Sequence, residues 1–257
     1  TKNRDAVKFR MGTVATAVYS TGYSSYIQTM NTAVAVQTDG LSKHYGSVAA
    51  VDGVSLRVAR GEIYAFLGLN GAGKTTTIRM LLGMVRPSAG EARVLGQAIS
   101  GRGRGPWESV GYLVETPHAY PELTVRENLE AARRLRSGVP KQAVASIIER
   151  LGLGAYADRR AGTLSLGNVQ RLGLAKAMLH NPALLILDEP ANGLDPAGIV
   201  EIRHFLRELA EEQGVGVVIR QDALLLLEVV ATVALLFLAV PVDAHGAGAT
   251  CPQRDLS

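Results

Sequence analysis

Between an apolar run and a helix-forming segment, the chain reads Gly68-Leu69-Asn70-Gly71-Ala72-Gly73-Lys74-Thr75. A glycine, four residues and then Gly-Lys-Thr is the pattern of a phosphate-binding loop. Glycines let the backbone curl so that successive N–H groups face phosphate oxygens, an approach that a Cβ would obstruct. Lys74 can then reach the outer phosphates, and the hydroxyl of Thr75 can ligate the Mg²⁺ that bridges them.

The residues on either side suit such a loop. The run 62–67 is short and apolar, as a strand would be, and 76–82 continues as a helix. A loop between a strand and a helix brings phosphate to a helix N-terminus, where the dipole and the exposed N–H groups favour an anion. The alternative is a glycine-rich turn that matches by chance, and the flanks argue against it. The sequence therefore predicts binding of a nucleoside triphosphate.

Length and composition narrow the class of protein. The 257 residues are 47% hydrophobic, enough for one large α/β domain or a core with a smaller inserted lobe. A net charge of +4 fits an ordinary solvated surface, and segment 101–106 lacks the repeats of an RNA-binding Arg-Gly segment, so no nucleic-acid partner is expected. Cys251 stands alone and the histidines are scattered, which excludes a disulfide framework and argues against a Cys/His metal site.

Hydrophobic periodicity predicts the order of the elements. Two helices without a strand between them, 124–135 and 141–151, are expected to form a lobe inserted into the core. Thr124 is the expected N-cap of the first, with Glu127 completing a capping box. A further helix is predicted at 169–179. Turn chemistry is expected at Asp39-Gly40, and strands are predicted at 33–36, 48–58, 91–96, 110–114, 183–187 and 215–219.

Two adjacent carboxylates, Asp188 and Glu189, end the apolar run 183–187. Carboxylates at the C-terminal end of a buried parallel strand lie at the ligand crevice of an α/β sheet. There Asp188 can hold Mg²⁺ through its water shell, and Glu189 can orient and deprotonate a water. The alternative is a helix cap or a solvated turn. Upstream, Tyr45 could stack on a nucleobase, although a Tyr beside a turn is more often partly buried packing.

The ordered set of motifs resembles the ATPase subunit of ABC transporters. It consists of the phosphate loop, Leu164-Ser165-Leu166-Gly167-Asn168, and the run 188–196, which reads Asp-Glu-Pro-Ala-Asn-Gly-Leu-Asp-Pro. The likeness covers 33–220, and the segment 115–129 is similar to bacterial drug and antibiotic exporters. It implies an α/β, P-loop NTPase fold. A mostly parallel sheet core, an N-terminal antiparallel β subdomain and an α-helical lobe at about 118–165 are expected.

The resemblance also implies roles for individual residues. Glu189 would be the general base, with Lys74 as a second catalytic residue and Tyr45 stacked on adenine. Ser165 and Gly167 would donate to the γ-phosphate of ATP bound by a second copy, and Asp195 would belong to the loop that crosses this interface. ATP would be held by Gly68, Asn70, Gly71, Ala72, Gly73, Lys74, Thr75 and Thr76, and Mg²⁺ by Thr75, Asp188 and Glu115.

The partners follow from the same resemblance. Two subunits would close head-to-tail on two ATP molecules and open after hydrolysis. This motion would drive a separate transmembrane permease from the cytoplasmic face of the membrane. The substrate would be a drug-like or antibiotic molecule that is exported.

The chain departs from the family pattern at several positions. Leu69 replaces a proline, Glu115 stands where a glutamine is usual, and Leu166 and Asn168 replace glycine and glutamine. At 220–222 the chain reads Arg-Gln-Asp where the family has Ser-Ser-His, so an aspartate replaces the histidine that contacts the γ-phosphate.

The two ends of the chain also differ from the family. Segment 223–242 is almost wholly apolar and as long as a membrane span, but loss of the family C-terminus, for example by a frameshift, is the favoured interpretation of 221–257. Residues 1–32 are interpreted as an extension, or a mis-set start, without structure of its own. Two alternative functions stay open. One is a hydrolysis-impaired ATP-binding remnant, and the other is a soluble non-transport ABC ATPase, against which the lack of long coiled-coil insertions or a duplicated domain argues.

Overall fold

The computed structural model describes residues 6–10, 15–20, 33–67, 71–99, 105–114 and 117–220, the first two ranges as backbone only. The predictions for Gly68, Asn70 and Glu115 lie outside these ranges, as do those for Asp222 and the apolar run after it. No helix within the described ranges combines the length and the apolarity that crossing a membrane requires.

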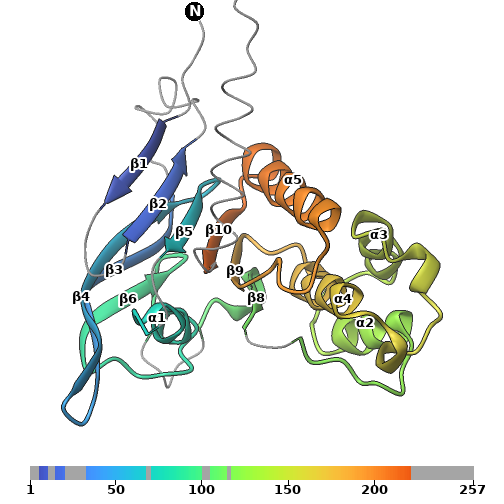
Figure 1. The fold of residues 1–257 in the computed structure, drawn as a ribbon, viewed down its shortest axis with the longest axis horizontal. Coiled ribbons are helices and arrows are strands. Elements are labelled where there is room, and N and C mark those ends of the chain that lie inside the picture. The colour runs from blue at the N-terminus through green and yellow to red at the C-terminus, as the bar shows by residue number, and fades with distance from the viewer. Residues whose placement is uncertain are drawn as a thin grey trace, which may run out of the picture. The chain divides into compact units, whose positions relative to one another are not determined.

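Four parallel strands form the core of the larger sheet. They are β5 (Ile63–Leu67), β8 (Val110–Leu113), β9 (Leu184–Asp188) and β10 (Gly216–Arg220). Figure 1 shows β10 beside β9, and the strands lie in the order β5, β10, β9, β8. Every residue of β9 is buried, as expected for a parallel strand covered on both faces. The predicted parallel core is confirmed.

Alternate residues of β9 enter two different cores. Leu185 and Leu187 pack in the core with α4 (Leu166–Met178) and α5 (Pro196–Gln213). Leu184 and Ile186 pack in the core with α1 (Lys74–Leu81) and the smaller sheet. Because successive strand residues point to opposite faces, α1 lies on one face of the sheet and α4 and α5 on the other.

The smaller sheet is antiparallel and corresponds to the predicted N-terminal β subdomain. Its strands lie in the order β4 (Val48–Ala59), β3 (Val34–Tyr45), β6 (Ala89–Val94) and β7 (Gln97–Ala98). The turn predicted at Asp39-Gly40 is wrong, because β3 runs through these residues with a shift of register. Gly40 has φ 55°, and a Cβ on Gly90 of β6 would lie 2.2 Å from the Gly40 carbonyl oxygen. The glycines therefore allow a bulge that brings two backbones together.

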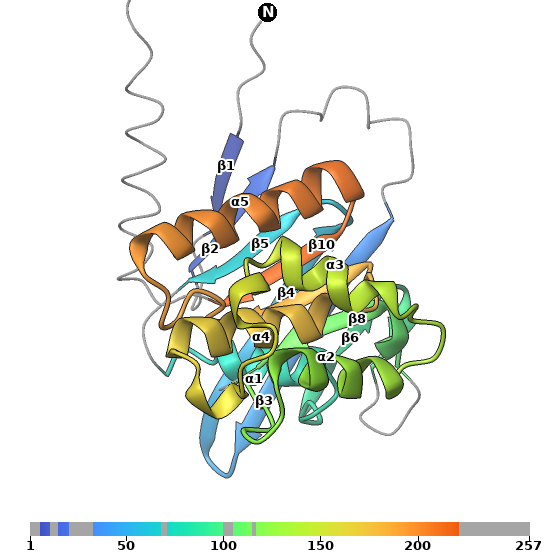
Figure 2. The same ribbon diagram turned by 90° about the vertical axis from the view of Figure 1, so that its right-hand side faces the viewer.

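The helical lobe contains α2 (Val125–Arg134) and α3 (Gln142–Arg150), which pack on each other and on α4 (Figure 2). The capping box predicted for α2 is present. The Glu127 N–H donates to Thr124 Oγ1 at 3.2 Å, and the Thr124 N–H donates to Glu127 Oε2 at 2.8 Å. Three short 3-10 helices complete the described helices: η1 (Trp107–Ser109), η2 (Gly154–Tyr156) and η3 (Ala161–Thr163).

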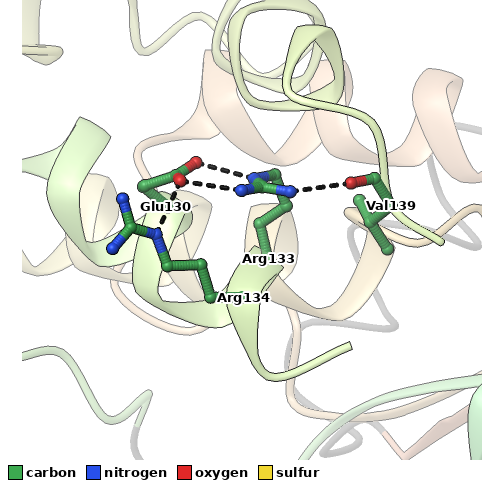
Figure 3. A network of polar contacts seen from close by, with 4 residues as sticks. All are labelled: Glu130, Arg133, Arg134 and Val139. Carbon is green, nitrogen blue, oxygen red and sulfur yellow. Dashed lines mark hydrogen bonds and ion pairs between the residues drawn. The ribbon is translucent and has the colours of Figure 1, made fainter. Parts of the chain in front are cut away.

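A charged network closes the C-terminal end of α2 (Figure 3). Glu130 accepts hydrogen bonds from Nε of Arg133 at 2.7 Å and from Nε of Arg134 at 2.9 Å. These bonds, with a third from Arg133 Nη2, lower the pKa of Glu130 to about 2. Arg133 Nη1 also donates to the Val139 carbonyl at 2.9 Å. The network thus fixes the end of α2 to the connection that leads to α3.

Buried Asn128 holds the chain that enters α2. Its amide nitrogen donates to the carbonyls of Tyr120, Leu123 and Thr124 at 3.0–3.2 Å. Its Oδ1 accepts from the Tyr120 N–H at 2.9 Å and from Lys176 Nζ of α4 at 3.0 Å. Three carbonyl groups share the two hydrogens of this amide, and its oxygen accepts two bonds. One buried side chain therefore satisfies several polar groups around it.

Helices α5 and α4 also differ from the prediction. Helix α5 was not predicted, although Asp195 caps its first turn, Pro196 follows, and Gly214 ends it at φ 67°. Helix α4 begins at Leu166 rather than 169, because the Ser165 side chain caps it. In α5 the buried residues Ile202, Phe205, Leu206 and Leu209 also recur at helical spacing.

The N-terminal segment also differs. Within residues 1–32, interpreted above as lacking structure, β1 (Ala6–Arg10) and β2 (Ala15–Ser20) form an antiparallel pair. Strand β2 continues the larger sheet by pairing antiparallel with β5. This pairing leaves fewer N–H and C=O groups of β5 without partners than an open sheet edge would. The sequence of β2, Ala-Thr-Ala-Val-Tyr-Ser, contains the residues that favour a strand.

We expect Asn128→Ala to lower the free energy of unfolding by about 3 kcal/mol, because it leaves several buried polar groups without partners. Urea unfolding followed by circular dichroism measures the change. As a control, Asp158→Ala removes only an exposed ion pair with Arg126 and should cost less than about 0.5 kcal/mol. Equal midpoints for the two variants would contradict the structural role of Asn128.

A pH dependence follows from His180, whose Nε2 lies 3.2 Å from the Val110 carbonyl oxygen. Burial, with a smaller contribution from the charge of Arg136, lowers the pKa of His180 to about 4, against an ordinary value of 6.5. The unfolded chain therefore binds the proton more readily, so stability is complete above pH 6.5 and falls as the pH drops toward 4.

Since the ring is only half-buried, we expect this loss to be at most about 2 kcal/mol. His180→Gln keeps a hydrogen-bond donor but does not titrate. Unfolding free energies measured from pH 7.5 to 4.5 should fall less steeply for the variant than for the parent. Parallel curves would show that His180 is not the group responsible.

Candidate functional site

The phosphate loop ends where α1 begins. Gly71 and Gly73 have φ 85° and 81°, a left-handed conformation that favours glycine. A Cβ on Gly73 would lie 2.2 Å from the Ala50 carbonyl oxygen of β4, so the close approach of two backbones also requires glycine. Of the residues predicted to hold ATP, the structure describes Gly71, Ala72, Gly73, Lys74, Thr75 and Thr76.

Lys74 is the first residue of α1 and is only 3% exposed. The first turn of the helix is closed by the Thr77 N–H, which donates to the Gly73 carbonyl at 2.8 Å. The N–H groups that precede this bond in the chain point out of the helix end, where an anion is favoured. The sequence pattern thus leads to the expected helix N-terminus.

The two predicted carboxylates lie at the end of β9. Asp188 is buried, and Glu189 follows it with φ 49°, which is uncommon for a residue with a side chain. Two hydrogen bonds hold this conformation. The Glu189 N–H donates to the Arg220 carbonyl at 2.8 Å, and Gln170 Nε2 donates to the Glu189 carbonyl at 2.9 Å. A backbone held in this way directs the Glu189 side chain, as is common at functional sites.

Arg220 joins residues from the phosphate loop helix and from β9. It ends β10 directly opposite Asp188 in the parallel register. Its Nη1 donates to Thr75 Oγ1 at 2.6 Å, and its Nη2 bonds to Glu189 Oε1. Its Nε forms an ion pair with Asp188 Oδ1, although this contact is not aligned as a hydrogen bond. One guanidinium therefore contacts three of the predicted site residues.

Sequence reasoning did not find Arg220 or Gln170 as parts of the site. A charged residue at the end of the last core strand was a usable signal for Arg220, because neighbouring parallel strands end at the same edge of a sheet. For Gln170 the signal was a polar residue on the buried side of α4, where it is 3% exposed. Such a residue must find a hydrogen-bond partner.

A second group forms at the N-terminal ends of α4 and α5. Ser165 Oγ accepts from the Asn168 N–H at 3.3 Å, and Asp195 Oδ1 accepts from the Gly198 N–H at 2.9 Å. A Cβ on Gly167 would lie 3.0 Å from the Gly193 carbonyl oxygen, so the two loops are in contact. The structure thus brings Ser165, Gly167 and Asp195 into one neighbourhood. Leu166, which lies between Ser165 and Gly167 in the chain, is 58% exposed.

Tyr45 lies on the hairpin of β3 and β4. Tyr45 is 52% exposed, and Lys43 Nζ lies 5.0 Å from the centre of the tyrosine ring. Lys43 is opposite Val51 in the β3–β4 register, and Val51 is one of the residues that a Cβ on Gly73 would meet. The hairpin therefore flanks the phosphate loop and carries an accessible aromatic ring.

The sequence model of the ABC transporter family matches residues 51–192, which is more than half of the chain. The chain belongs to the ABC transporter family. This confirms the family inferred from the ordered motifs.

Two of the similar proteins are named for bacitracin transport. The bacitracin transport ATP-binding protein BcrA of Bacillus licheniformis is 43% identical over 189 residues, 74% of this chain and 62% of the relative. Its counterpart in Enterococcus faecalis is 42% identical over 198 residues, 77% of this chain and 64% of the relative. This ABC family chain thus spans less than two thirds of the length of these relatives.

The fold class is confirmed by solved structures. The structure of an ATP-binding subunit of an ABC transporter is 30% identical and has a TM-score of 0.65, covering 75% of this chain and 81% of that one. A nucleotide-free ATP-binding cassette from an ABC transporter is 26% identical, with a TM-score of 0.63 over 77% of this chain and 84% of that one.

Proposed function

We propose that this chain is the ATP-binding and ATP-hydrolysing subunit of an exporter. The observation that carries the proposal is the convergence of Thr75, Asp188 and Glu189 beside the N-terminal end of α1. A helix N-terminus suits phosphate, and carboxylates at a strand end suit the water that attacks it. The bacitracin transport relatives support a drug-like or antibiotic substrate.

In this proposal ATP binds across the phosphate loop, with its phosphates on Gly68, Asn70 and the residues 71–76. Lys74 neutralises the outer phosphates, and Tyr45 stacks on the adenine. Glu189 is the general base. Its left-handed backbone, fixed by the bonds to Arg220 and Gln170, would hold the carboxylate toward the attacking water.

Mg²⁺ is the proposed second cofactor. Thr75 and Asp188 offer hydroxyl and carboxylate oxygens, the donors that Mg²⁺ prefers, and Glu115 is proposed as a third ligand. Among the residues that the structure describes, no cluster of three His, Cys, Asp or Glu could hold a metal alone. When bound, the ion would neutralise charge on the phosphates.

The proposed partners are a second copy of the subunit and a separate transmembrane permease at the cytoplasmic face of the membrane. Support for the second copy comes from the helix layers. Lys74 and Ser165 mark the starts of helices on opposite faces of the sheet. Ser165 and Asp195 are exposed, and together with Gly167 they would complete the ATP site of a head-to-tail partner.

A specific observation favours a second candidate function, ATP binding with impaired hydrolysis. The Glu189 carboxylate is bonded to the Arg220 guanidinium, which reduces its ability to accept a proton from water. The aspartate at position 222, predicted to replace a γ-phosphate donor, would act in the same direction.

We expect Lys74→Ala to weaken ATP binding at least about tenfold, because a buried positive charge beside the phosphates is lost. Isothermal calorimetry with Mg·ATP measures the affinity, and circular dichroism checks the fold. Lys141→Ala, an exposed lysine before α3, is the control and should bind normally. Unchanged affinity in Lys74→Ala would overturn the assignment of the nucleotide site.

Glu189→Gln should trap an ATP-bound dimer and lower turnover by about 10²-fold, because the amide keeps the shape of the carboxylate and cannot act as a base. Gel filtration with ATP and steady-state phosphate release measure the two effects. If the parent hydrolyses no faster than Glu189→Gln while both bind ATP, the hydrolysis-impaired function is correct instead.

A further inference from the structure

Arg220 is positioned by the sheet rather than by a flexible loop. It is the last residue of β10, which pairs in parallel with both β9 and β5, so it lies opposite Asp188 on one side and Phe66 on the other. Its carbonyl accepts the Glu189 N–H. The strand therefore delivers the guanidinium to the space between the carboxylates and Thr75.

Little solvent reaches these contacts. The side chains of Arg220, Asp188 and Glu189 are 19%, 5% and 24% exposed. At such burial, attraction between opposite charges is much less screened than at the surface. The planar guanidinium is also suited to several acceptors at once, since its donors have a fixed arrangement.

The atoms that Arg220 contacts are those proposed to serve Mg²⁺ and the attacking water. Mg²⁺ requires oxygen ligands at about 2.0–2.1 Å in octahedral geometry. Thr75 Oγ1 already accepts a bond from Arg220, and Asp188 Oδ1 is in an ion pair with it. A divalent ion at the same oxygens would be repelled by the guanidinium.

The formal charges at the site also disfavour a divalent ion and Arg220 at the same oxygens. Lys74 and Arg220 carry two positive charges, and Asp188 and Glu189 carry two negative charges. Among the residues that the structure describes, these four charges balance without a metal, and a divalent ion at Thr75 and Asp188 would add positive charge beside Arg220.

We propose that Arg220 is an internal cation that competes with Mg²⁺ for Thr75 and Asp188. It holds the site together when no metal is bound, and metal binding displaces it. Because the same guanidinium bonds to Glu189, its displacement also releases the proposed general base. Metal binding and availability of the base are thereby linked through one side chain. The inference rests on the proposed nucleotide site for the place of the metal.

The first experiment measures metal affinity directly. Arg220→Met keeps the apolar stem and removes the charge. Electron paramagnetic resonance reports free Mn²⁺ during titration of protein saturated with a non-hydrolysable ATP analogue. The apparent dissociation constant of Mn²⁺ should fall about tenfold or more in the variant, as expected when a charge-assisted competitor is lost. An unchanged or larger constant would overturn the proposal.

Arg133 provides a matched control. It is 16% exposed, is paired with a glutamate and also bonds to a carbonyl (Figure 3). Arg133→Met makes the same substitution at a similarly buried ion pair in the helical lobe. It should leave the Mn²⁺ constant at the parent value, so a tightening in this variant would also contradict the proposal.

A second measurement needs no nucleotide. In EDTA, Arg220→Met should melt at a lower temperature than the parent, because two carboxylates lose their counter-charge. Adding 10 mM Mg²⁺ should raise its melting temperature by at least about 3 °C more than it raises that of the parent. Equal shifts would contradict the competition.

Arg220→Lys covers the case in which the methionine variant fails to fold. A lysine keeps one charge and cannot contact all three partners at once, so its Mn²⁺ constant should lie below that of the parent. A constant equal to the parent's would overturn the proposal. Loss of analogue binding in the parent would instead contradict the nucleotide site, whereas normal analogue binding with equal Mn²⁺ constants contradicts only the role of Arg220.

Discussion

The parallel pairing of β9 with β10 is the constraint on which the described site depends. In this register Asp188 and Arg220 end neighbouring strands at the same edge, and the Glu189 N–H is bonded to the Arg220 carbonyl. The register is fixed in turn by burial, because a slip of one residue would exchange the side chains that enter the two cores. The packing of leucines and valines in the sheet thus determines where the charged groups meet.

Local signals sufficed for much of the fold. The phosphate-loop pattern, the capping box at Thr124 and the apolar run before Asp188 each determine their structure within a few residues. Helix α5 also carried local signals, in its caps and in apolar residues at helical spacing (Ile202, Phe205, Leu206 and Leu209), which the prediction did not use. The bulge at Gly40 could not be predicted locally, because it depends on the approach of Gly90 from another strand.

The site could be predicted less completely for the same reason. Lys74 and Thr75 share one motif, as do Asp188 and Glu189, so sequence spacing identifies each pair. Arg220 belongs to neither motif and reaches both through the strand order, and Gln170 reaches the Glu189 carbonyl from helix α4. Contacts between segments distant in sequence follow from topology, which motif spacing does not encode.

The hydrogen bonds of Lys176 have a consequence for motion. This lysine lies on α4, yet its ammonium group bonds to Asn128 of α2 at 3.0 Å and to the His118 carbonyl at 2.9 Å, before α2 begins. Burial also lowers the pKa of Lys176, and these bonds compensate for the removal of its charge from water. Three segments are therefore joined at one side chain, so any displacement of α2 would also pull on α4, the helix that Ser165 caps.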